Sequence, residues 1–279
     1  MKWQGRRGSD NVEDRRGMST GTKIVGGGIG TLVIVLLVYL LGGDPSGILQ
    51  ESGSAETAGP VEASAEENAL AQFVSVVLAD TEEVWGKIFA QSGATYRQPT
   101  LVLFRDQVQS ACGYATAASG PFYCPGDEKV YIDLSFFDDL RAKYGAYGDF
   151  AIAYVVAHEI GHHVQNQLGI LEEVQKERQR LSEVRANQLT VRLELQADFL
   201  AGVWAHYASR MFDSVEEGDI EEALNAAASI GDDVLQKKYQ GRVVPDSFTH
   251  GTAAQRSSWL RKGWETGDLN QGDTFSGAI

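Results

Sequence analysis

Residues 148–167 read GDFAIAYVVAHEIGHHVQNQ, and this stretch is the strongest indication of the fold in the sequence. Its apolar residues are nearly continuous from Phe150 through Val156, which is typical of a helix buried in a domain core. His158 and His162 follow, and positions four apart lie on one face of a helix, one turn apart. The stretch therefore predicts a buried helix that presents two imidazoles side by side.

The five residues from His158 to His162 form the HExxH arrangement, in which two imidazoles reach one zinc ion. Glu159 is placed to meet the water on the metal rather than the metal itself. Residue frequencies alone would produce HExxH in roughly one per cent of chains this long, so the motif is suggestive and not decisive. The competing interpretation is a helix with two exposed histidines, which the apolar run before the motif disfavours.

A later stretch, LELQADFLAGVWA at 193–205, supplies a third ligand. Catalytic zinc needs three protein ligands and one open position, and two histidines with Glu194 satisfy this requirement. Asp198 lies four residues further on, so both carboxylates point the same way and Asp198 can accept the spare N–H of a ligand histidine. A surface carboxylate is the competing interpretation of Glu194, but an acidic pair inside an apolar stretch favours a bound cation.

Two late residues are candidates for stabilising the oxyanion that forms during peptide hydrolysis. His250 precedes a predicted helix that carries Arg256, and cationic or hydrogen-bond donors near the reacting carbonyl serve this purpose. A helix-capping loop with a surface Arg explains them equally well. His163 points about 100° away from His162 around the helix, so we do not expect it to be a ligand. We expect His206 to pack structurally.

The rest of the folded region predicts mostly helices and a few short strands. Alternating or helical spacing of apolar residues, bounded by Pro and Gly turn signals, carries these predictions. We therefore expect an α+β domain that is mainly helical, with a small sheet. The predicted helices span 69–91, 134–144, 148–167, 186–212, 216–240 and 252–264, the predicted strands span 100–104 and 129–133, and 171–185 is a charged excursion.

The segment from Ile24 to Leu41 has eighteen uncharged residues, enough to cross a bilayer as one transmembrane helix. A signal peptide is the competing interpretation, but no small-residue cleavage site follows directly. Lys and Arg precede the segment, and none occurs from 42 to 80, so the positive-inside rule predicts a cytoplasmic N-terminus and a periplasmic or extracellular domain. We therefore divide the chain into a basic N-terminus at 1–23, the span at 24–41, a flexible linker at 42–67 and a catalytic domain at 68–279.

Charge and cysteine content restrict the classes of function. The net charge is −14, which repels nucleic-acid phosphates and makes DNA or RNA an unexpected partner. The two cysteines, Cys112 and Cys124, are too few for a four-cysteine zinc site. Gly120 and Pro121 lie between them, so the chain can turn back and pair them; we expect a disulfide in an oxidising compartment, with two unlinked buried thiols as the alternative.

Several of these motifs occur in an order that resembles one family. The chain is similar to the neutral zinc metallopeptidases of bacteria, the YpfJ-like proteins, over nearly its whole length. The resemblance rests on the basic N-terminus with a single anchor and on four segments: CGYATAASGPFYCPGDEKVYID, AHEIGHHVQNQLG, LELQADFLAGVWAH and FTHGTAAQRSSWLRKG. It implies a zincin-like domain in which His158, His162 and Glu194 bind Zn²⁺ and Glu159 is the catalytic base.

A second similarity concerns the membrane-bound prenyl-protein peptidases. They too have a ligand Glu followed four residues later by Asp, and a late His with an Arg six positions on. His250 and Arg256 have that spacing, so the resemblance implies that they hold the transition state. Some members of the first family have Cys where Phe199 stands, and any role of that thiol is absent here.

The sequence thus predicts a membrane-anchored zinc metallopeptidase that acts on a peptide or protein, with the strand at 129–133 pairing with an extended substrate. One alternative is a catalytically silent envelope protein that keeps zinc for structure and binds partners. A zinc-buffering protein is disfavoured, because five histidines and two cysteines offer too few ligands. A further alternative is an enzyme that is latent until 171–185 moves as a lid. The substrate, endo- or exopeptidase action and the oligomeric state stay open.

Overall fold

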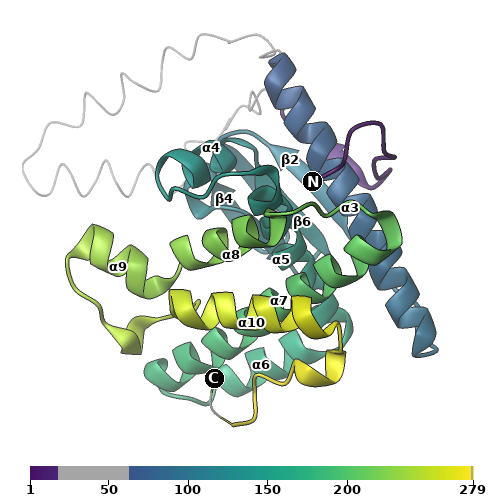
Figure 1. The fold of residues 1–279 in the computed structure, drawn as a ribbon. Coiled ribbons are helices and arrows are strands. Elements are labelled where there is room, and N and C mark those ends of the chain that lie inside the picture. The colour runs from purple at the N-terminus through teal and green to yellow at the C-terminus, as the bar shows by residue number, and fades with distance from the viewer. Residues whose placement is uncertain (18–62, 278) are drawn as a thin grey trace, which may run out of the picture. The chain divides into compact units, whose positions relative to one another are not determined.

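The computed structural model describes residues 1–17, 63–277 and 279 (Figure 1). Met1–Asp14 and Ala65–Ile279 together form one compact unit. The predicted membrane span at 24–41 and nearly all of the predicted linker lie outside the described residues. Within the part of the chain that is described, no helix combines the length and apolar character needed to cross a membrane.

A small mixed sheet forms one layer of the unit, as predicted. Its order is β1 (Val12–Asp14), β2 (Thr100–Phe104), β6 (Lys129–Asp133) and β5 (Phe122–Cys124). The first three strands are parallel, and β5 runs antiparallel to β6, with Tyr123 opposite Val130. β3 (Gln107–Ser110) and β4 (Gly113–Thr116) form a separate hairpin. The predicted strands at 100–104 and 129–133 are both confirmed, and both are buried inside the sheet.

Helices make up most of the unit and pack against this sheet and each other, so the mainly helical α+β class is confirmed (Figure 1). The main core joins side chains of α3, α5, α7 and the sheet, among them Trp85, Leu101, Ile132, Phe150 and Trp204. The helices are α3 (Ala65–Gln91), α4 (Ser135–Ala142), α5 (Asp149–Gln167), α6 (Ile170–Arg178), α7 (Glu183–Phe212), α8 (Asp219–Ser229), α9 (Asp232–Gln240) and α10 (Ala253–Thr266).

One predicted helix is two in the structure. The single helix expected at 216–240 is interrupted at Ile230 and Gly231, which separate α8 from α9. A side chain at Gly231 would lie 2.3 Å from the backbone nitrogen of Ala253, so the break brings the start of α9 against the start of α10. This contact between distant residues is the reason why local periodicity did not indicate the break.

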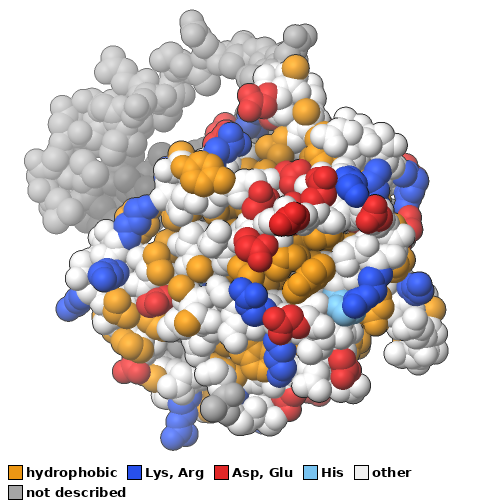
Figure 2. Space-filling model, viewed as in Figure 1, with side chains coloured by type: hydrophobic (Ala, Val, Ile, Leu, Met, Phe, Trp, Pro, Cys, Tyr) orange, Lys and Arg blue, Asp and Glu red, His pale blue; other side chains and the backbone are white. Residues whose placement is uncertain are grey.

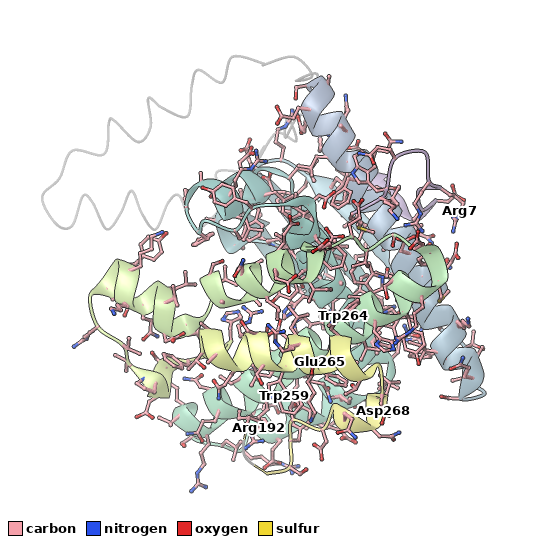
Figure 3. The ribbon with its side chains drawn as sticks, viewed as in Figure 1. Arg7, Arg192, Trp259, Trp264, Glu265 and Asp268 are labelled. Atoms are coloured by element: carbon pink, nitrogen blue, oxygen red, sulfur yellow. A yellow bond between two sulfur atoms is a disulfide. The ribbon has the colours of Figure 1, made fainter. Side chains whose placement is uncertain are left out.

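The helices α7 and α10 cross at very short range because both have glycine at the crossing. A Cβ atom on Gly263 would lie 2.0 Å from the carbonyl oxygen of Phe199, and one on Gly202 would lie 2.1 Å from that of Leu260. Trp264, on the same helix as Gly263, accepts a hydrogen bond at its carbonyl from His206 Nδ1 at 2.7 Å (Figure 3). His206 is therefore part of the packing of these two helices, as expected.

The N-terminal residues differ from the predicted division of the chain. β1 extends the edge of β2, and Arg6 donates two hydrogen bonds of 2.6 Å to the carboxylate of Asp80 on α3. Three of the cations that suggested a cytoplasmic flank are paired with carboxylates of the domain: Arg6 with Asp80, Arg7 with Glu83 and Lys2 with Asp213. Met1–Asp14 is thus a part of the folded unit rather than a separate segment.

The predicted disulfide is present between Cys112 and Cys124. It ties the turn after β3 to the end of β5.

On the face shown in Figure 2, basic side chains lie scattered among acidic and apolar ones and form no continuous basic strip. This face therefore offers a nucleic-acid backbone no extended cationic surface.

Candidate active site

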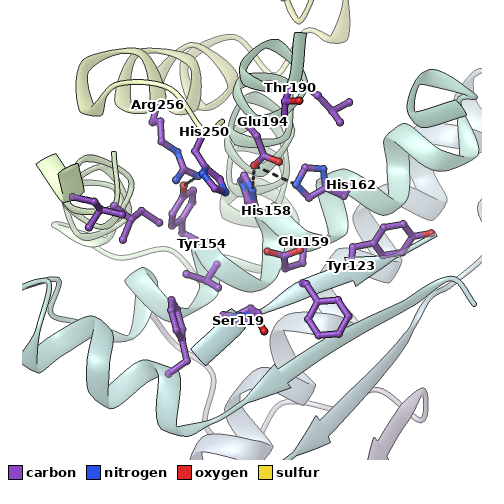
Figure 4. Close-up of a pocket in the computed structure, with 18 of the residues that line it drawn as sticks. Ser119, Tyr123, Tyr154, His158, Glu159, His162, Thr190, Glu194, His250 and Arg256 are labelled. Carbon is purple, nitrogen blue, oxygen red and sulfur yellow. Dashed lines mark hydrogen bonds and ion pairs between the residues drawn. The ribbon is translucent and has the colours of Figure 1, made fainter. Parts of the chain in front are cut away.

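The structure brings His158, His162 and Glu194 together at the floor of a cleft (Figure 4). The two histidines come from α5 and Glu194 from α7, which packs beside α5. Close packing is permitted by Gly161, because a Cβ there would lie 3.0 Å from the carbonyl oxygen of Ala197. The glycine inside the HExxH stretch therefore sets how near Glu194 lies to the two imidazoles.

The three side chains fit a tetrahedral zinc ion. Glu194 Oε2 lies 3.2 Å from His158 Nε2 and 3.5 Å from His162 Nε2, and the three ligand atoms all lie within 4.8 Å of one another. Zinc bonds of about 2.0–2.1 Å in tetrahedral geometry separate neighbouring ligand atoms by about 3.3 Å. The donor set of two imidazole nitrogens and one carboxylate is also one that zinc uses in catalytic sites.

Each ligand histidine is oriented through its other ring nitrogen. His158 Nδ1 donates to Asp198 Oδ1 at 2.8 Å, and His162 Nδ1 donates to Gln165 Oε1 at 2.9 Å. Gln165 is itself fixed, because its amide nitrogen donates to the carbonyl of Leu193 at 2.8 Å. Both imidazoles therefore turn Nε2 toward Glu194, and because Nδ1 is used as a donor, Nε2 is the nitrogen available to a metal ion.

Asp198 is fully buried and anchors a group of hydrogen bonds behind the ligands. Its carboxylate accepts from Tyr154 Oη at 2.6 Å, and from Arg256 Nε at 2.9 Å and Nη2 at 3.0 Å. Arg256 also donates from Nη2 to Tyr154 Oη at 3.0 Å. The structure therefore places Arg256 on Asp198, where it neutralises a buried carboxylate, and Arg256 also lines the cleft. A role beside the reacting carbonyl stays a prediction.

The charges of this group explain the shifted pKa values. Burial raises the pKa of Asp198, but the neighbouring Arg256 and His158 outweigh it and lower the pKa to about 2. Burial lowers the pKa of His158, whereas the Asp198 and Glu194 carboxylates raise it, to about 10 on balance. Burial likewise raises the pKa of Glu194, but the two imidazoles hold it well below its ordinary value. The site thus keeps its carboxylates ionised in a buried setting.

Glu159 lines the cleft next to the ligands and is 8% exposed. Its carboxylate has no hydrogen-bond or ion-pair partner among the described residues, and in Figure 4 it projects into the cleft below His158 and His162. A carboxylate with free lone pairs beside the metal ligands is suited to accept a proton from water.

His250 reaches the same cleft from the loop before α10. Asp232, at the start of α9, accepts hydrogen bonds from the backbone nitrogens of Thr249 and His250 at 2.7 Å and of Gly251 at 3.1 Å. Asp232 Oδ1 also lies 3.3 Å from His250 Nδ1, and the side chain of His250 is 50% exposed. Burial lowers the pKa of His250, but the hydrogen bond with Asp232 raises it above its ordinary value overall.

His163 is excluded from the site, as expected. Its ring is fully buried, with Nδ1 3.0 Å from Tyr123 Oη and Nε2 2.6 Å from the carbonyl of Arg97. Three residues of the site were not identified from the sequence: Tyr154, Gln165 and Asp232. Tyr154 is four residues before His158 and so shares its helical face, a signal that could have indicated it. Gln165 is three residues after His162 on the same helix, a spacing that could also have indicated it. The contacts of Asp232 depend on the loop before α10 and left no local signal.

The cleft has a volume of about 730 Å³ and extends beyond the metal ligands. One part of its lining is the segment 117–123 that leads into β5, and another part comes from α6 and α7, including Leu171, Arg178 and Leu193. The charged excursion at 171–185 is therefore α6 and the start of α7, with α6 lining the cleft. Leu171 and Val174 of α6 pack on Leu193 of α7.

Comparison with known proteins identifies the relatives of this chain. The sequence model of a family described as "Putative neutral zinc metallopeptidase" matches residues 1–275. The uncharacterized protein YpfJ of Escherichia coli K12 is 49% identical over 288 aligned positions that cover 100% of both chains. The uncharacterized proteins Mb2605 of Mycobacterium bovis and Rv2575 of Mycobacterium tuberculosis H37Rv are each 47% identical over 193 positions, or 66% of this chain and 64% of theirs. No solved structure matches.

Proposed function

Because the chain belongs to the neutral zinc metallopeptidase family, we propose that it is a zinc-dependent peptidase that hydrolyses peptide bonds in this cleft. The observation that carries the proposal is the convergence of His158, His162 and Glu194 at the cleft floor beside the carboxylate of Glu159, which has no partner among the described residues. Three ligands directed at an open cleft leave one coordination position free for catalysis.

His158, His162 and Glu194 would hold the zinc ion, which when bound would supply Lewis-acid chemistry that makes water nucleophilic near neutral pH. Glu159 accepts a proton from the attacking water and later delivers it to the leaving amine. His250 uses its Nε2–H to stabilise the negative charge that develops on the carbonyl oxygen, since Nδ1 faces Asp232. Arg256 acts through Asp198, which orients His158, and is a positioning residue.

An extended peptide binds along β5 in this proposal rather than along residues 129–133. β6, the strand at 129–133, is paired with β2 on one side and β5 on the other, so its backbone groups are already used. β5 is the last strand in the sheet order, and Phe122 and Tyr123 line the cleft. An open strand edge beside the metal ligands can bind a substrate through its backbone.

We also propose that the apolar stretch 24–41 attaches the enzyme to a membrane and that the catalytic domain lies outside the cytoplasm. The disulfide between Cys112 and Cys124 supports an oxidising compartment. Alkaline carbonate extraction of cell membranes tests the attachment, and alkylation of thiols in intact cells tests the disulfide. Release of the full-length chain by carbonate would contradict the membrane attachment. Free thiols at Cys112 and Cys124 in the freshly isolated protein would contradict the oxidising compartment.

The peptidase proposal is tested with the full chain in detergent, loaded with zinc and incubated with a diverse peptide library read by mass spectrometry. Glu159→Gln keeps the three metal ligands but removes the base, so zinc content by elemental analysis stays equal to the parent. The cleavage rate falls by about 10²–10⁴-fold, the usual contribution of general acid–base catalysis.

Glu173→Gln is the matched control, because Glu173 is exposed on α6 outside the cleft lining. It is expected to cleave like the parent. A Glu159→Gln protein as active as the parent would remove Glu159 from the mechanism. A zinc-loaded parent that cleaves nothing would instead favour the catalytically silent binding protein.

A further inference from the structure

Most charged side chains in the cleft have partners of their own. Asp139 pairs with Lys143 at 2.6 Å, Arg256 with Asp198 at 2.9 Å, and His250 with Asp232 at 3.3 Å. Arg178 also lines the cleft, yet its guanidinium has neither an ion pair nor a hydrogen bond among the described residues. It is therefore a cleft cation whose charge no carboxylate of the described residues neutralises.

The surroundings of Arg178 make this lack of a partner costly. The residue is half-buried, and its Nε atom is buried with no acceptor in reach. A guanidinium donor removed from water without an acceptor loses hydrogen-bond free energy, and a ligand that supplies the acceptor recovers it. The neighbouring cation of the same helix, Lys176, differs because it is exposed and paired with Glu172.

Arg178 is held in a fixed relation to the metal ligands. It is the last residue of α6, and two side chains of that helix, Leu171 and Val174, pack on Leu193. Leu193 directly precedes the ligand Glu194 on α7. A group bound by Arg178 is thus positioned relative to the reacting bond by a buried contact between α6 and α7.

We propose that Arg178 is a specificity residue that binds a carboxylate of the peptide substrate, an inference that rests on the proposed peptidase function. The planar guanidinium presents a fork of donors that matches a carboxylate. The rest of the chain carries a strong negative charge, so a local cation is needed to hold an acidic group. The carboxylate is either that of an Asp or Glu side chain or the C-terminal carboxylate of the peptide.

Four matched peptides distinguish these two sources. They share one sequence and carry either Glu or Gln near the cleaved bond, and either a free or an amidated C-terminus. The zinc-loaded full chain in detergent is assayed for kcat/KM with each peptide. The parent prefers one kind of carboxylate by roughly tenfold or more, the strength expected of a charge-assisted pair. A Glu preference indicates an internal acidic side chain, and a free-acid preference indicates action near a C-terminus.

Variants assign that preference to Arg178. Arg178→Gln lowers kcat/KM for the preferred peptide roughly tenfold more than for its neutral partner, and Arg178→Lys restores part of the preference. Arg180→Gln is the matched control, because Arg180 is exposed and outside the cleft lining, and it keeps the parent preference. An unchanged preference in Arg178→Gln, or an equal loss on all four peptides, would overturn the proposal.

Binding separates this inference from the peptidase proposal itself. In the Glu159→Gln background, fluorescence anisotropy measures the affinity for the same four peptides without cleavage. Adding Arg178→Gln removes the roughly tenfold preference for the carboxylate peptide while Arg180→Gln does not. If the parent cleaves nothing but binds with this Arg178-dependent preference, the peptidase proposal fails and the specificity inference stands. If the parent cleaves the peptides without such a preference, the specificity inference fails and the peptidase proposal stands.

Discussion

Asp198 links the metal ligands to the hydrophobic core, because its carboxylate binds His158, Tyr154 and Arg256 at once. A buried carboxylate is stable only when its charge is paired and its lone pairs are used. Arg256 is equally dependent, since it is 3% exposed and Asp198 is its ion-pair partner. The orientation of His158, a proposed zinc ligand, and the neutralisation of the buried Arg256 therefore depend on the same side chain.

Asp198→Ala is expected to lower the free energy of unfolding by about 3–5 kcal/mol, because Arg256 is left buried without a counter-charge. The zinc affinity falls about 10–100-fold, because His158 loses its orienting partner. Chemical denaturation and zinc titration measure the two effects. Asp246→Ala, at an exposed position, is the control and changes stability by less than about 0.5 kcal/mol. Equal stability of the two variants would contradict the role given to Asp198.

The pH profile of cleavage tests His250. Its pKa is raised overall by Asp232, so the imidazole stays protonated above the pH at which a free histidine loses its proton. If the cationic form stabilises the oxyanion, kcat/KM falls as pH rises through that raised pKa. Asp232→Asn removes the negative partner and moves this limb to lower pH, while His250→Gln abolishes the limb and lowers kcat by about 10²–10³-fold. If kcat/KM fell at the same pH in the parent, Asp232→Asn and His250→Gln proteins, His250 would have no role in the mechanism.

The sequence predicted the part of the site that lies within single helices. His158, Glu159 and His162 are contiguous, and the i, i+4 spacing of Glu194 and Asp198 inside an apolar stretch indicated their shared face. The contact of Arg256 with Asp198 was not predicted, because the direction in which Arg256 points is set by the crossing of α10 over α7. Asp232 is positioned by the meeting of α9 with the loop before α10, and no local pattern encodes that contact.

Among the helices, the crossing of α7 and α10 brings the ligand Glu194 and the positioning residue Arg256 into one site. The crossing is close because Gly202 and Gly263 leave room for the opposing backbone. Helical periodicity in the sequence predicted both helices, but it carries no information on which faces meet. Likewise β1 was not predicted, because it has three residues and pairs with residues 101–103, far along the chain.

Gly263→Ala is expected to destabilise the protein by about 2 kcal/mol or more, because its Cβ would lie 2.0 Å from the Phe199 carbonyl oxygen and must push the helices apart. The zinc affinity falls with it, since Arg256 and Asp198 separate. Gly86→Ala is the matched control. A Cβ at Gly86, within α3, meets nothing within 4 Å, so alanine raises stability by about 0.5–1 kcal/mol. Chemical denaturation measures the free energy of unfolding of both variants. A change in the same direction for Gly263→Ala and Gly86→Ala would refute the argument.

On the scale of the whole molecule, the N-terminal residues complete the domain. β1 covers the edge of β2, and Trp3 packs edge-on against Phe73 of α3 with ring centroids 5.4 Å apart. A shortened chain that starts at Ala65 would lose this strand and expose the backbone of β2, a form prone to aggregation. The catalytic domain is thus built from both sides of the stretch between Asp14 and Ala65.

Two neighbouring arginines test this docking. Arg6→Ala leaves the Asp80 carboxylate buried without its two charged hydrogen bonds, and is expected to lower the free energy of unfolding by about 2 kcal/mol. Arg7 points outward beside α3 (Figure 3), and Arg7→Ala removes an exposed pair with Glu83 at a cost of less than about 1 kcal/mol. Equal effects in chemical denaturation would mean that the N-terminal residues are not docked on α3.

The pairing of β1 with β2 also determines which of the described residues share one aqueous compartment. Each complete crossing of a lipid bilayer moves a polypeptide to the opposite compartment, and hydrogen bonds join Val12–Asp14 to Leu101–Leu103 only within one compartment. Val12–Asp14 and the rest of this folded unit therefore lie on the same side of any membrane to which the chain is attached. Whichever compartment contains Arg6 also contains the zinc ligands, so tags placed at the two ends of the chain report the same aqueous space.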